Sequence, residues 1–510
     1  MSCRSVLAKS TFVTLAVMTL IGLSGTGARA ELSIVNGWFV HDGRAVWGYA
    51  QHNGWWRNGQ RANLTRNAVG ETGPNRTEDL ELLTDNMLRW GYPGFEHNFG
   101  LWYDRRRDEH DSEKRGNANV QGPFLEMPWQ RSSQGEAWDG LPQYDLTRFN
   151  PWYFDRLTEF ARLSDRKGTL LLHNFYMQHA LLEGNYHYVD FPWREVNSIQ
   201  STGMPDTIPA ASAFYDTTNT ALLELHRLYI RHCLDKLGSY DNVIHLLSEE
   251  YTGPVSFVRF WAKTVSAWEK ENGRSVKLAL SATRDVTEEI LADTILRDRF
   301  QVIDLRYWWF NTDGSLVAPM GGQNIPGRYR GQINSTSPEQ IYAQVRRYRN
   351  SYPDKAIIHE YEASAQGTWA FLMAGGSMLV RRLEYFDSSD PKRYTQPPDT
   401  DDIKPLYDFI NTHLAASLPL MKPLDLVSGD SPSCWCIGQP GTNYLCYSMQ
   451  GDKLKIDLRD CKGRFEATWV NPRNGNFIPL TSADIFEVGE ICSVNTPDNM
   501  DWALWIRAVE

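Results

Sequence analysis

Two short segments of the sequence end in pairs of glutamates that follow apolar runs. In NVIHLLSEEYTGP the pair is Glu249 and Glu250, and in KAIIHEYEAS it is Glu360 and Glu362. Glycoside hydrolysis needs two carboxylates, one that donates a proton and one that acts as a nucleophile or as a base toward water. Because side chains alternate along a strand, only one of Glu249 and Glu250 is expected to face a cleft, whereas Glu360 and Glu362 could both face it. The alternative is that these glutamates only cap elements or form salt bridges.

Further polar and aromatic residues follow other apolar runs. A cleft that binds sugar combines hydrogen-bonding side chains with aromatic rings on which the sugar can stack. A single histidine in such a position more often has a structural role, but polar residues at five predicted strand ends favour a cleft. The residues that we predict to bind substrate are His52, Trp55, Arg89, His173, Asn174, Arg306, Tyr307 and Trp308.

Motifs for several other chemistries do not occur in the sequence. It contains no H-E-x-x-H, G-x-S-x-G or Walker pattern, so nothing in it supports a metalloprotease, a serine hydrolase or an NTPase. We therefore expect no metal and no cofactor.

The two glutamate pairs lie in a long region where predicted helices and strands alternate. Asn150, Pro151 and Gly168 have the positions of a helix cap, a first helical residue and a helix end, and strands are expected over 45–56 and 86–92. About eight apolar strands between helices predict a (β/α)₈ TIM barrel over residues 31–422, with its active site at the carboxyl ends of the strands. A doubly wound sheet is the rival fold, but no G-x-G-x-x-G turn follows the first strand.

The sequence changes character near residue 426. YLCYSM, KLKIDLRD, RFEATWVN, NFIPLT and DWALWIRAV are short strand patterns separated by turn residues, which predicts a β-sandwich over residues 426–510. Five cysteines lie between 434 and 492, and we expect one or two disulfides among them, with Cys233 unpaired in the barrel. A zinc site is the alternative use of these cysteines.

Composition narrows the class of partner. The 52 Lys and Arg residues against 62 Asp and Glu residues give a net charge of −10, which argues against binding nucleic acid. The 19 Trp, 23 Tyr and 21 Phe residues suit a carbohydrate substrate, whose C–H faces stack on flat rings. The protein is expected to act as a monomer.

The first thirty residues have the pattern of a secretory signal peptide. Arg4 and Lys9 precede the apolar run FVTLAVMTLIGLSG, and Ala28-Arg29-Ala30 forms the cleavage pattern. The alternative is a membrane anchor, but the run is shorter than the roughly 20 residues that cross a bilayer. We expect residues 1–30 to be removed, no membrane span to remain, and the mature chain to be secreted or periplasmic.

The chain resembles the apiosidase-like glycoside hydrolases, which pair a TIM barrel with a C-terminal β-sandwich that carries a collagen-binding label. The resemblance rests on SEEYTGP, on HEYE followed by TWAFLMAGGSMLV, and on WVNPRNGNF and DWALWI. It implies a retaining enzyme with Glu250 as the acid/base, Glu249 standing where the clan usually has Asn, and Glu360 as the nucleophile. Glu249 and Glu362 are the alternatives, and Tyr307 matches the strand-6 tyrosine that bonds the nucleophile.

The predicted function is a secreted glycoside hydrolase acting on a plant or algal polysaccharide or its oligosaccharides. A second class remains open, a non-catalytic carbohydrate-binding or surface-attachment protein built on the same barrel. Only the enzyme requires Glu250 and Glu360 to act together.

Overall fold

The computed structural model describes most of the chain after residue 30. The described ranges are 31–52, 79–99, 127–182, 188–189, 191–306, 309–310, 316–317, 337–360, 364–382, 400–430, 432–451, 453–480, 486–487 and 489–509. The predicted signal peptide lies outside these ranges, as do Trp55, Tyr307, Trp308 and Glu362. None of the helices in the described ranges is both long and apolar enough to cross a bilayer.

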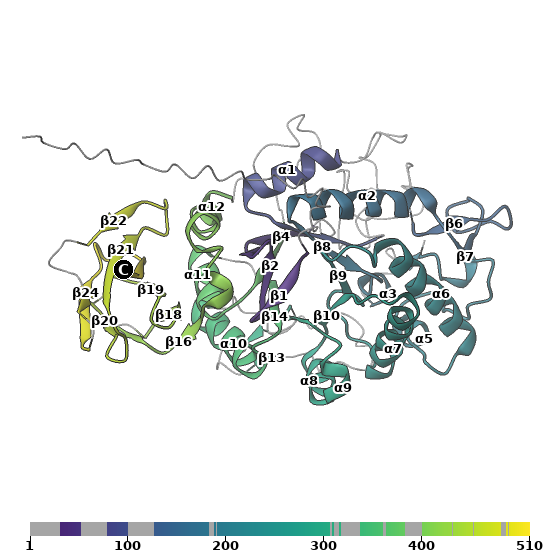
Figure 1. The fold of residues 1–510 in the computed structure, drawn as a ribbon. Helices are drawn as coiled ribbons and strands as arrows, with labels where there is room; N and C mark the ends of the chain where they lie inside the picture. The colour runs from purple at the N-terminus through teal and green to yellow at the C-terminus, as the bar shows by residue number, and fades with distance from the viewer. Residues whose placement is uncertain are drawn as a thin grey trace, which may run out of the picture. The chain divides into compact units, whose positions relative to one another are not determined.

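Eight parallel strands close into a barrel, so the predicted TIM barrel is confirmed (Figure 1). Each strand pairs with its neighbours in chain order, and the last pairs with the first. The strands are β4 (Tyr49–His52), β5 (Gly94–His97), β8 (Leu170–Asn174), β9 (Val243–Leu246), β10 (Lys277–Ser281), β11 (Val302–Asp304), β14 (Ala356–Glu360) and β15 (Met378–Arg382).

Helices connect and surround these strands (Figure 1). Helix α2 begins and ends as predicted, because the Asn150 side chain accepts from the Trp152 N–H and Gly168 ends the helix at φ 70°. The longer helices are α1 (Leu80–Trp90), α2 (Pro151–Lys167), α6 (Thr220–Leu237), α7 (Val255–Asn272), α8 (Arg284–Ala292), α10 (Pro338–Ser351), α11 (Ala365–Met373) and α12 (Thr400–Phe409). Shorter helices are α3 (His179–Leu182), α5 (Ala211–Phe214) and α9 (Thr294–Arg297).

The strand expected over 86–92 is wrong, because residues 86–90 belong to helix α1. Asp79 caps this helix through the Leu82 N–H, and Gly91 ends it in the left-handed region at φ 84°. Leu80, Leu83, Met87 and Trp90 are buried at helical spacing. The second barrel strand is therefore β5, a few residues further along the chain.

The barrel wall separates two apolar layers. Alternate strand residues, among them Leu172, Leu246, Val302 and Ile358, form the core inside the barrel. The residues between them belong to a second core that they share with the surrounding helices. Because side chains alternate along a strand, this assignment also fixes which way each polar residue at a strand end points.

Smaller sheets lie before and beside the barrel. A three-stranded sheet is formed by β1 (Ser33–Val35), β2 (Trp38–His41) and β3 (Arg44–Ala45). Two-stranded sheets are formed by β6 (Trp129–Arg131) with β7 (Tyr144–Phe149), and by β12 (Trp309–Phe310) with β13 (Leu316–Val317).

The C-terminal region is an antiparallel sandwich, as predicted, and its first strand already begins at Lys422. The larger sheet contains β16 (Lys422–Leu424), β18 (Cys434–Gln439), β19 (Asn443–Ser448), β25 (Trp502–Val509), β21 (Arg464–Val470), β22 (Phe477–Pro479) and β23 (Phe486–Glu487). The smaller sheet contains β17 (Val427–Ser428), β20 (Lys453–Asp457) and β24 (Ile491–Asn495). Apolar residues of both sheets form one core between them.

The other face of the larger sheet packs against the barrel helices. Trp435 stacks on Tyr342 of α10 with ring centroids 4.7 Å apart, and Tyr447 stacks on Trp369 of α11 at 4.9 Å. These strand residues belong to the same apolar core as the barrel helices, and residues 31–510 form one compact unit. The larger sheet is thus covered on both faces.

The cysteines differ from the disulfide expectation. Cys233 is a buried thiol in α6, as expected. Cys436 and Cys446 lie opposite each other on β18 and β19, yet both are thiols, and Cys461 lies 3.1 Å from the Tyr444 hydroxyl instead of bridging another cysteine. Burial among apolar side chains lets a thiol pack as a small hydrophobic group, so the sandwich core forms without these bridges.

Candidate active site

A buried arginine, Arg306, contacts four carboxylates at the carboxyl ends of the barrel strands. Nη1 of Arg306 lies 2.7 Å from Oε2 of Glu96, 3.0 Å from Oε2 of Glu249 and 3.8 Å from Oε2 of Glu360. Its Nε lies 2.7 Å from Oδ2 of Asp304. We refer to these five residues as the Arg306 cluster.

The strands position the cluster by alternation. Glu96, Asp304 and Glu360 stand on β5, β11 and β14 in the positions that face the barrel interior, directly beyond the apolar interior residues. Asn174 on β8 continues the same interior row, and its Nδ2 donates to Oε1 of Glu96 at 2.9 Å. The interior is therefore apolar below and polar at the strand ends, which is the face that carries the active site in TIM-barrel enzymes.

The electrostatics of the cluster are set by one cation among four acids. The four carboxylates raise the pKa of Arg306 above its usual range, against the effect of burial, so the guanidinium stays charged. Burial raises the pKa of Asp304 to about 6, Arg306 opposes this shift, and the nearby charge of Glu360 adds to it. A single guanidinium cannot balance four ionised carboxylates in a buried place, so part of the cluster is expected to hold protons near neutral pH.

The structure distinguishes between the adjacent Glu249 and Glu250. Glu249 joins the Arg306 cluster, whereas Glu250 adopts φ 53°, a left-handed conformation that is unfavourable for such a residue. The backbone there is fixed on both sides: the Glu250 N–H donates to Oγ of Ser281 at 3.2 Å, and its carbonyl accepts from Nε2 of Gln178 at 2.7 Å. Gln178 is itself held by the Thr252 N–H at 2.8 Å. The chain is therefore held firmly where Glu249 reaches the cluster.

Glu249 and Glu360 lie close to each other. Their Oε2 atoms contact the same nitrogen of Arg306, at 3.0 and 3.8 Å, so they cannot be further apart than the sum of those two distances. Glu360 keeps 11% of its side-chain exposure, more than any other member of the cluster, so solvent reaches the cluster at this residue.

Several residues predicted to bind substrate lie elsewhere. Arg89 is exposed in the last turn of helix α1, not at a strand end. His173 faces the helices, where its ring packs on Phe175, its Nδ1 lies 3.2 Å from Nδ1 of His245, and burial lowers its pKa to about 3. Only the backbone of His52 is described, as the last residue of β4. Of the predicted substrate-binding residues that the structure describes, Arg306 belongs to the cluster and Asn174 hydrogen-bonds to one of its members, Glu96.

Glu96 and Asp304 were not predicted from the sequence. The predicted second strand, 86–92, ends before GFEH, so the strand end that carries Glu96 was not expected there. Asp304 is the last residue of β11 and precedes Arg306 by two residues, so alternation along the predicted strand would have placed both side chains on one face. In the described part of the chain no three side chains of the metal-binding types are arranged to hold an ion.

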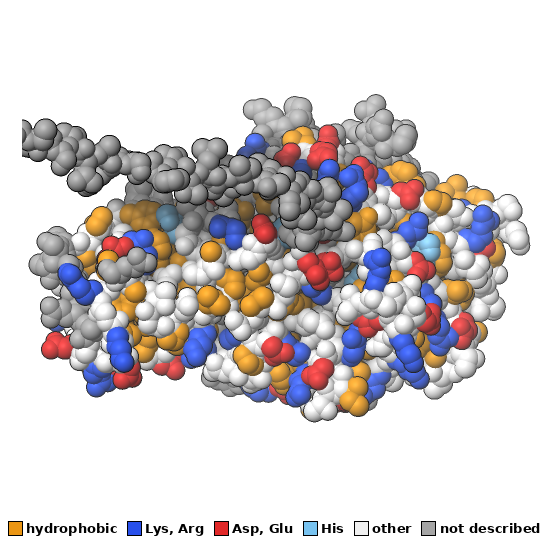
Figure 2. Space-filling model, in the orientation of Figure 1, with side chains coloured by type: hydrophobic (Ala, Val, Ile, Leu, Met, Phe, Trp, Pro, Cys, Tyr) orange, Lys and Arg blue, Asp and Glu red, His pale blue; other side chains and the backbone are white. Residues whose placement is uncertain are grey.

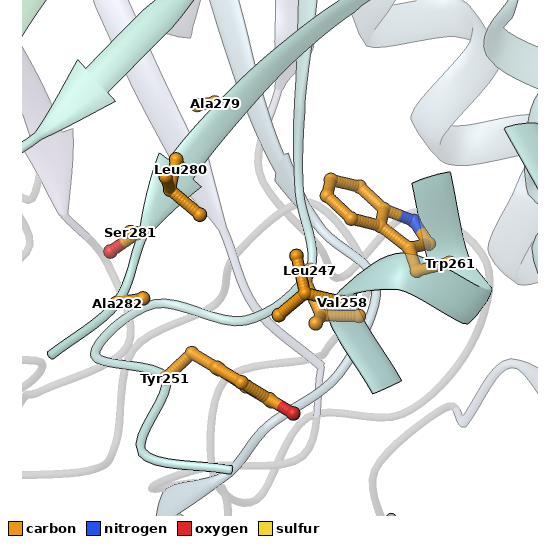
Figure 3. A pocket seen from close by; sticks show the side chains of 8 residues that line it. All are labelled: Leu247, Tyr251, Val258, Trp261, Ala279, Leu280, Ser281 and Ala282. Carbon is orange, nitrogen blue, oxygen red and sulfur yellow. The ribbon is translucent and has the colours of Figure 1, made fainter. Parts of the chain in front are cut away.

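A small apolar hollow lies beside the cluster, between β10 and helix α7 (Figure 3). Trp261 and Val258 of α7 face Leu280 and Ala282 across it, and the Tyr251 ring closes one side. Its lining offers no set of polar groups that could bind a sugar, so this hollow is not part of the candidate site. On the face of the molecule in Figure 2, acidic and basic side chains are interspersed.

Comparison with protein families places the chain. A family model described as "Domain of unknown function (DUF6298)" matches residues 11–388, which is more than half of the 510 residues. The chain belongs to the DUF6298 family. The DUF6298 match includes all eight barrel strands and the whole Arg306 cluster, and it ends before the sandwich. No curated protein matches the chain.

Two solved structures share the architecture of this DUF6298 protein. One is described as a glycoside hydrolase, with a TM-score of 0.54 at 10% identity over 94% of this chain and 97% of that chain. The other is a glycoside hydrolase family 5 protein from Bacteroides vulgatus ATCC 8482, with a TM-score of 0.54 at 10% identity over 94% of each chain. At this identity the likeness concerns the fold. Neither description names an apiosidase or a collagen-binding module, so those parts of the resemblance stay predictions.

Proposed function

We propose that this DUF6298 protein is a retaining glycoside hydrolase in which Glu360 is the nucleophile and Glu249 the acid/base. The observation that carries the proposal is the contact of one guanidinium nitrogen, Nη1 of Arg306, with both carboxylates at the ends of the fourth and seventh strands. The fold shared with glycoside hydrolases supports it. The limit on the distance between the two Oε2 atoms is compatible with the ~5–5.5 Å typical of retaining enzymes.

In the first step, ionised Glu360 attacks the anomeric carbon and forms a glycosyl ester while the bond to the leaving oxygen breaks. Protonated Glu249 transfers its proton to that oxygen, so the leaving group departs as a neutral alcohol. In the second step, Glu249 takes a proton from water, and the resulting hydroxide displaces Glu360 from the anomeric carbon. Both carboxyl groups end as they began, and the configuration at the anomeric carbon is retained.

Arg306 supplies constant electrostatic support during these steps. Before the first step the negative charge of the pair is on Glu360, and in the ester intermediate it is on Glu249. Because Nη1 contacts both carboxylates, the guanidinium can pair with whichever one is ionised without moving far. Glu96 contacts the same nitrogen and Asp304 contacts Nε, and together they fix the orientation of the guanidinium.

Glu250, which the resemblance implied as the acid/base, is the alternative to Glu249, and the two can be tested against each other directly. The purified mature chain is assayed on a panel of plant and algal polysaccharides and aryl glycosides, with E360Q as the inactive control. Turnover that is lost in E360Q, with the product's anomeric configuration retained by NMR, is the expected result. Absence of turnover on the whole panel would contradict the enzyme and favour a carbohydrate-binding protein.

The export and the substrate class that we propose are supported by the sequence. The signal-peptide pattern of residues 1–30 supports export, and the acidic, aromatic-rich composition supports a carbohydrate substrate. The proposed substrates are therefore plant or algal polysaccharides, or oligosaccharides derived from them, met outside the cytoplasm. N-terminal sequencing of the exported protein, with Glu31 as the expected first residue, tests the export.

A further inference from the structure

The Arg306 cluster has an excess of negative charge. Among the described residues it contains Glu96, Glu249, Asp304 and Glu360 around a single guanidinium, and all four carboxylates contact that guanidinium. Three of these carboxylate side chains are at most 3% exposed, and Glu360 is the most exposed at 11%. An anionic ligand placed among these carboxylates would be repelled by them, and the repulsion would be weakly screened because little water separates the charges.

Three polar atoms in this site have no hydrogen-bond partner among the described residues. They are Nη2 of Arg306, Oδ1 of Asn174 and Oδ1 of Asp304, and all three residues are fully or almost fully buried. Asn174 and Arg306 bind the same carboxylate: Asn174 donates to Oε1 of Glu96 at 2.9 Å, and Arg306 donates to its Oε2 at 2.7 Å. Buried polar atoms are normally hydrogen-bonded, so several unsatisfied atoms at a candidate active site point to a ligand.

The orientation of the Asn174 amide is fixed by its neighbours. Its Nδ2 lies near two acceptors, the Glu96 carboxylate and, at 3.4 Å, the His97 carbonyl oxygen. The amide nitrogen must face them, so Oδ1 is the atom left without a partner. The described part of the site therefore presents one unpartnered donor, Nη2 of Arg306, and two unpartnered acceptors, Oδ1 of Asn174 and Oδ1 of Asp304.

A hydroxyl group fits this set of atoms, and an anion does not. A hydroxyl can accept from Nη2 and donate to one of the two acceptors, whereas an ionised carboxylate or sulfate can only accept. An anion would leave Oδ1 of Asn174 unsatisfied and would also add to the negative charge of the cluster.

We propose that the site takes neutral sugars, bound through hydroxyl groups at Asn174 and Arg306, and rejects uronic acids and sulfated sugars at this position. The inference rests on the proposed function, since it concerns the substrate of the same site. It selects among plant and algal polysaccharides, because many of them carry carboxylates or sulfates on most residues.

The test compares three sugars that differ only at C6. Aryl galactoside, aryl galacturonide and the methyl ester of that galacturonide, together with the matching gluco series, are assayed with the wild-type chain. We expect kcat/KM for the uronide to be at least about 100-fold below that of the neutral glycoside in the better-accepted series, because like charges at a recognition site are strongly unfavourable. The neutral methyl ester should recover most of that loss, which separates charge from shape.

Binding gives a second readout that does not need catalysis. Titration calorimetry of E360Q with neutral oligosaccharides and with the corresponding oligouronides should show the same preference. Adding N174A to E360Q should lower the affinity for the neutral oligosaccharide by at least about tenfold and should not raise the affinity for the oligouronide. Equal or better use of the uronide overturns the inference and leaves the proposed hydrolase standing. Selective neutral binding with no turnover retains the inference and removes the hydrolase. Failure to bind or turn over any neutral sugar overturns the inference.

Discussion

Two buried arginines occupy opposite ends of the barrel, and they are used in opposite ways. Arg306, at the carboxyl ends of the strands, is surrounded by carboxylates that raise its pKa, and its Nη2 has no partner in the part of the chain that the structure describes. Arg349 lies at the end of α10, near the segments that enter β14 and β15, and burial lowers its pKa to about 9. Its hydrogen-bond partners are mainly backbone carbonyls, including those of Gly37, Lys355 and Gly375.

The two arginines show that this fold keeps the residues of its candidate active site apart from the residues that stabilise it. Arg349 uses its donors to tie the N-terminal sheet, α10 and the segment after α11 together, and the space is so tight that a Cβ at Gly37 would collide with its guanidinium. Arg306 is also held by several contacts, but its partners are ionisable carboxylates. Its Nη2 has no partner among the described residues and could donate to a ligand. A charge satisfied by carbonyls can only hold the fold together, whereas a charge among acids can also stabilise a change of protonation.

The largest effect is expected for E360Q. Loss of the nucleophile should lower kcat by at least about 10⁴-fold, since no other group can form the glycosyl ester. The amide keeps the size of the side chain and removes one of the crowded negative charges, so the melting temperature should not fall. The measurement is turnover of the best panel substrate together with thermal unfolding, and a variant that is inactive only because it unfolds would contradict the assigned role.

The acid/base assignment is sharpened by comparing E249Q with E250Q. We expect E249Q to lower kcat by roughly 10²–10⁴-fold on substrates with poor leaving groups. The loss should be much smaller for aryl glycosides with activated leaving groups, and azide should restore turnover by replacing water in the second step. E250Q is the matched control and should keep most of its activity; the reverse pattern would assign the role to Glu250.

Changing Arg349 should affect stability without affecting catalysis. In R349M several buried carbonyls lose their donors, so we expect the free energy of unfolding to fall by about 3–5 kcal/mol. The kcat of the folded fraction should be unchanged, because Arg349 does not belong to the Arg306 cluster. R349K is the control that keeps a charge and fewer donors, and its stability should fall between those of R349M and wild type in urea unfolding.

The smallest effect is a pH dependence that comes from Asp304. Its pKa is about 6 in the folded chain and near 3.8 unfolded, so the folded state binds more protons between those values. The free energy of unfolding should therefore fall as pH rises through that window, by roughly 3 kcal/mol at most. Buried histidines such as His173, with its pKa lowered to about 3, act in the opposite direction, since their contribution is lost as pH falls below about 6.5.

The variant D304N separates these two contributions. Because it mimics the protonated acid and leaves the histidines in place, the difference in unfolding free energy between D304N and wild type should shift in favour of D304N from pH 4 to pH 8. Urea unfolding at the two pH values measures this shift, and a difference that does not change with pH would contradict the raised pKa.

The barrel could be predicted from the sequence because its strands are continuous apolar runs between amphipathic helices. The same property hid the direction of the side chains. In TLLLHN the residues of both faces are apolar, so nothing in the pattern shows that His173 points to the helices and Asn174 to the interior. Strand β18 was missed for a similar reason, since it is buried along nearly its whole length and does not alternate.

The alternation of side chains along a strand could not decide between Glu249 and Glu250, because both residues lie beyond the end of β9. The rule predicts correctly that only one of a neighbouring pair faces a given side while the chain remains a strand. Strand β9 ends at Leu246, and the backbone then turns into the left-handed conformation of Glu250 under the control of Gln178 and Ser281. Those contacts come from distant parts of the chain and have no local signal.

The sheet shared between sandwich and barrel has a consequence for how a polymer would reach this protein. Modules joined by flexible linkers can capture a chain and hand it to a distant catalytic centre, which raises its local concentration there. Trp435 and Tyr447 are instead stacked flat on rings of α10 and α11, so the sandwich has no free swing. A polysaccharide would have to diffuse to the barrel mouth by itself. Removing the sandwich would expose the apolar surface of the barrel helices and leave them prone to aggregation.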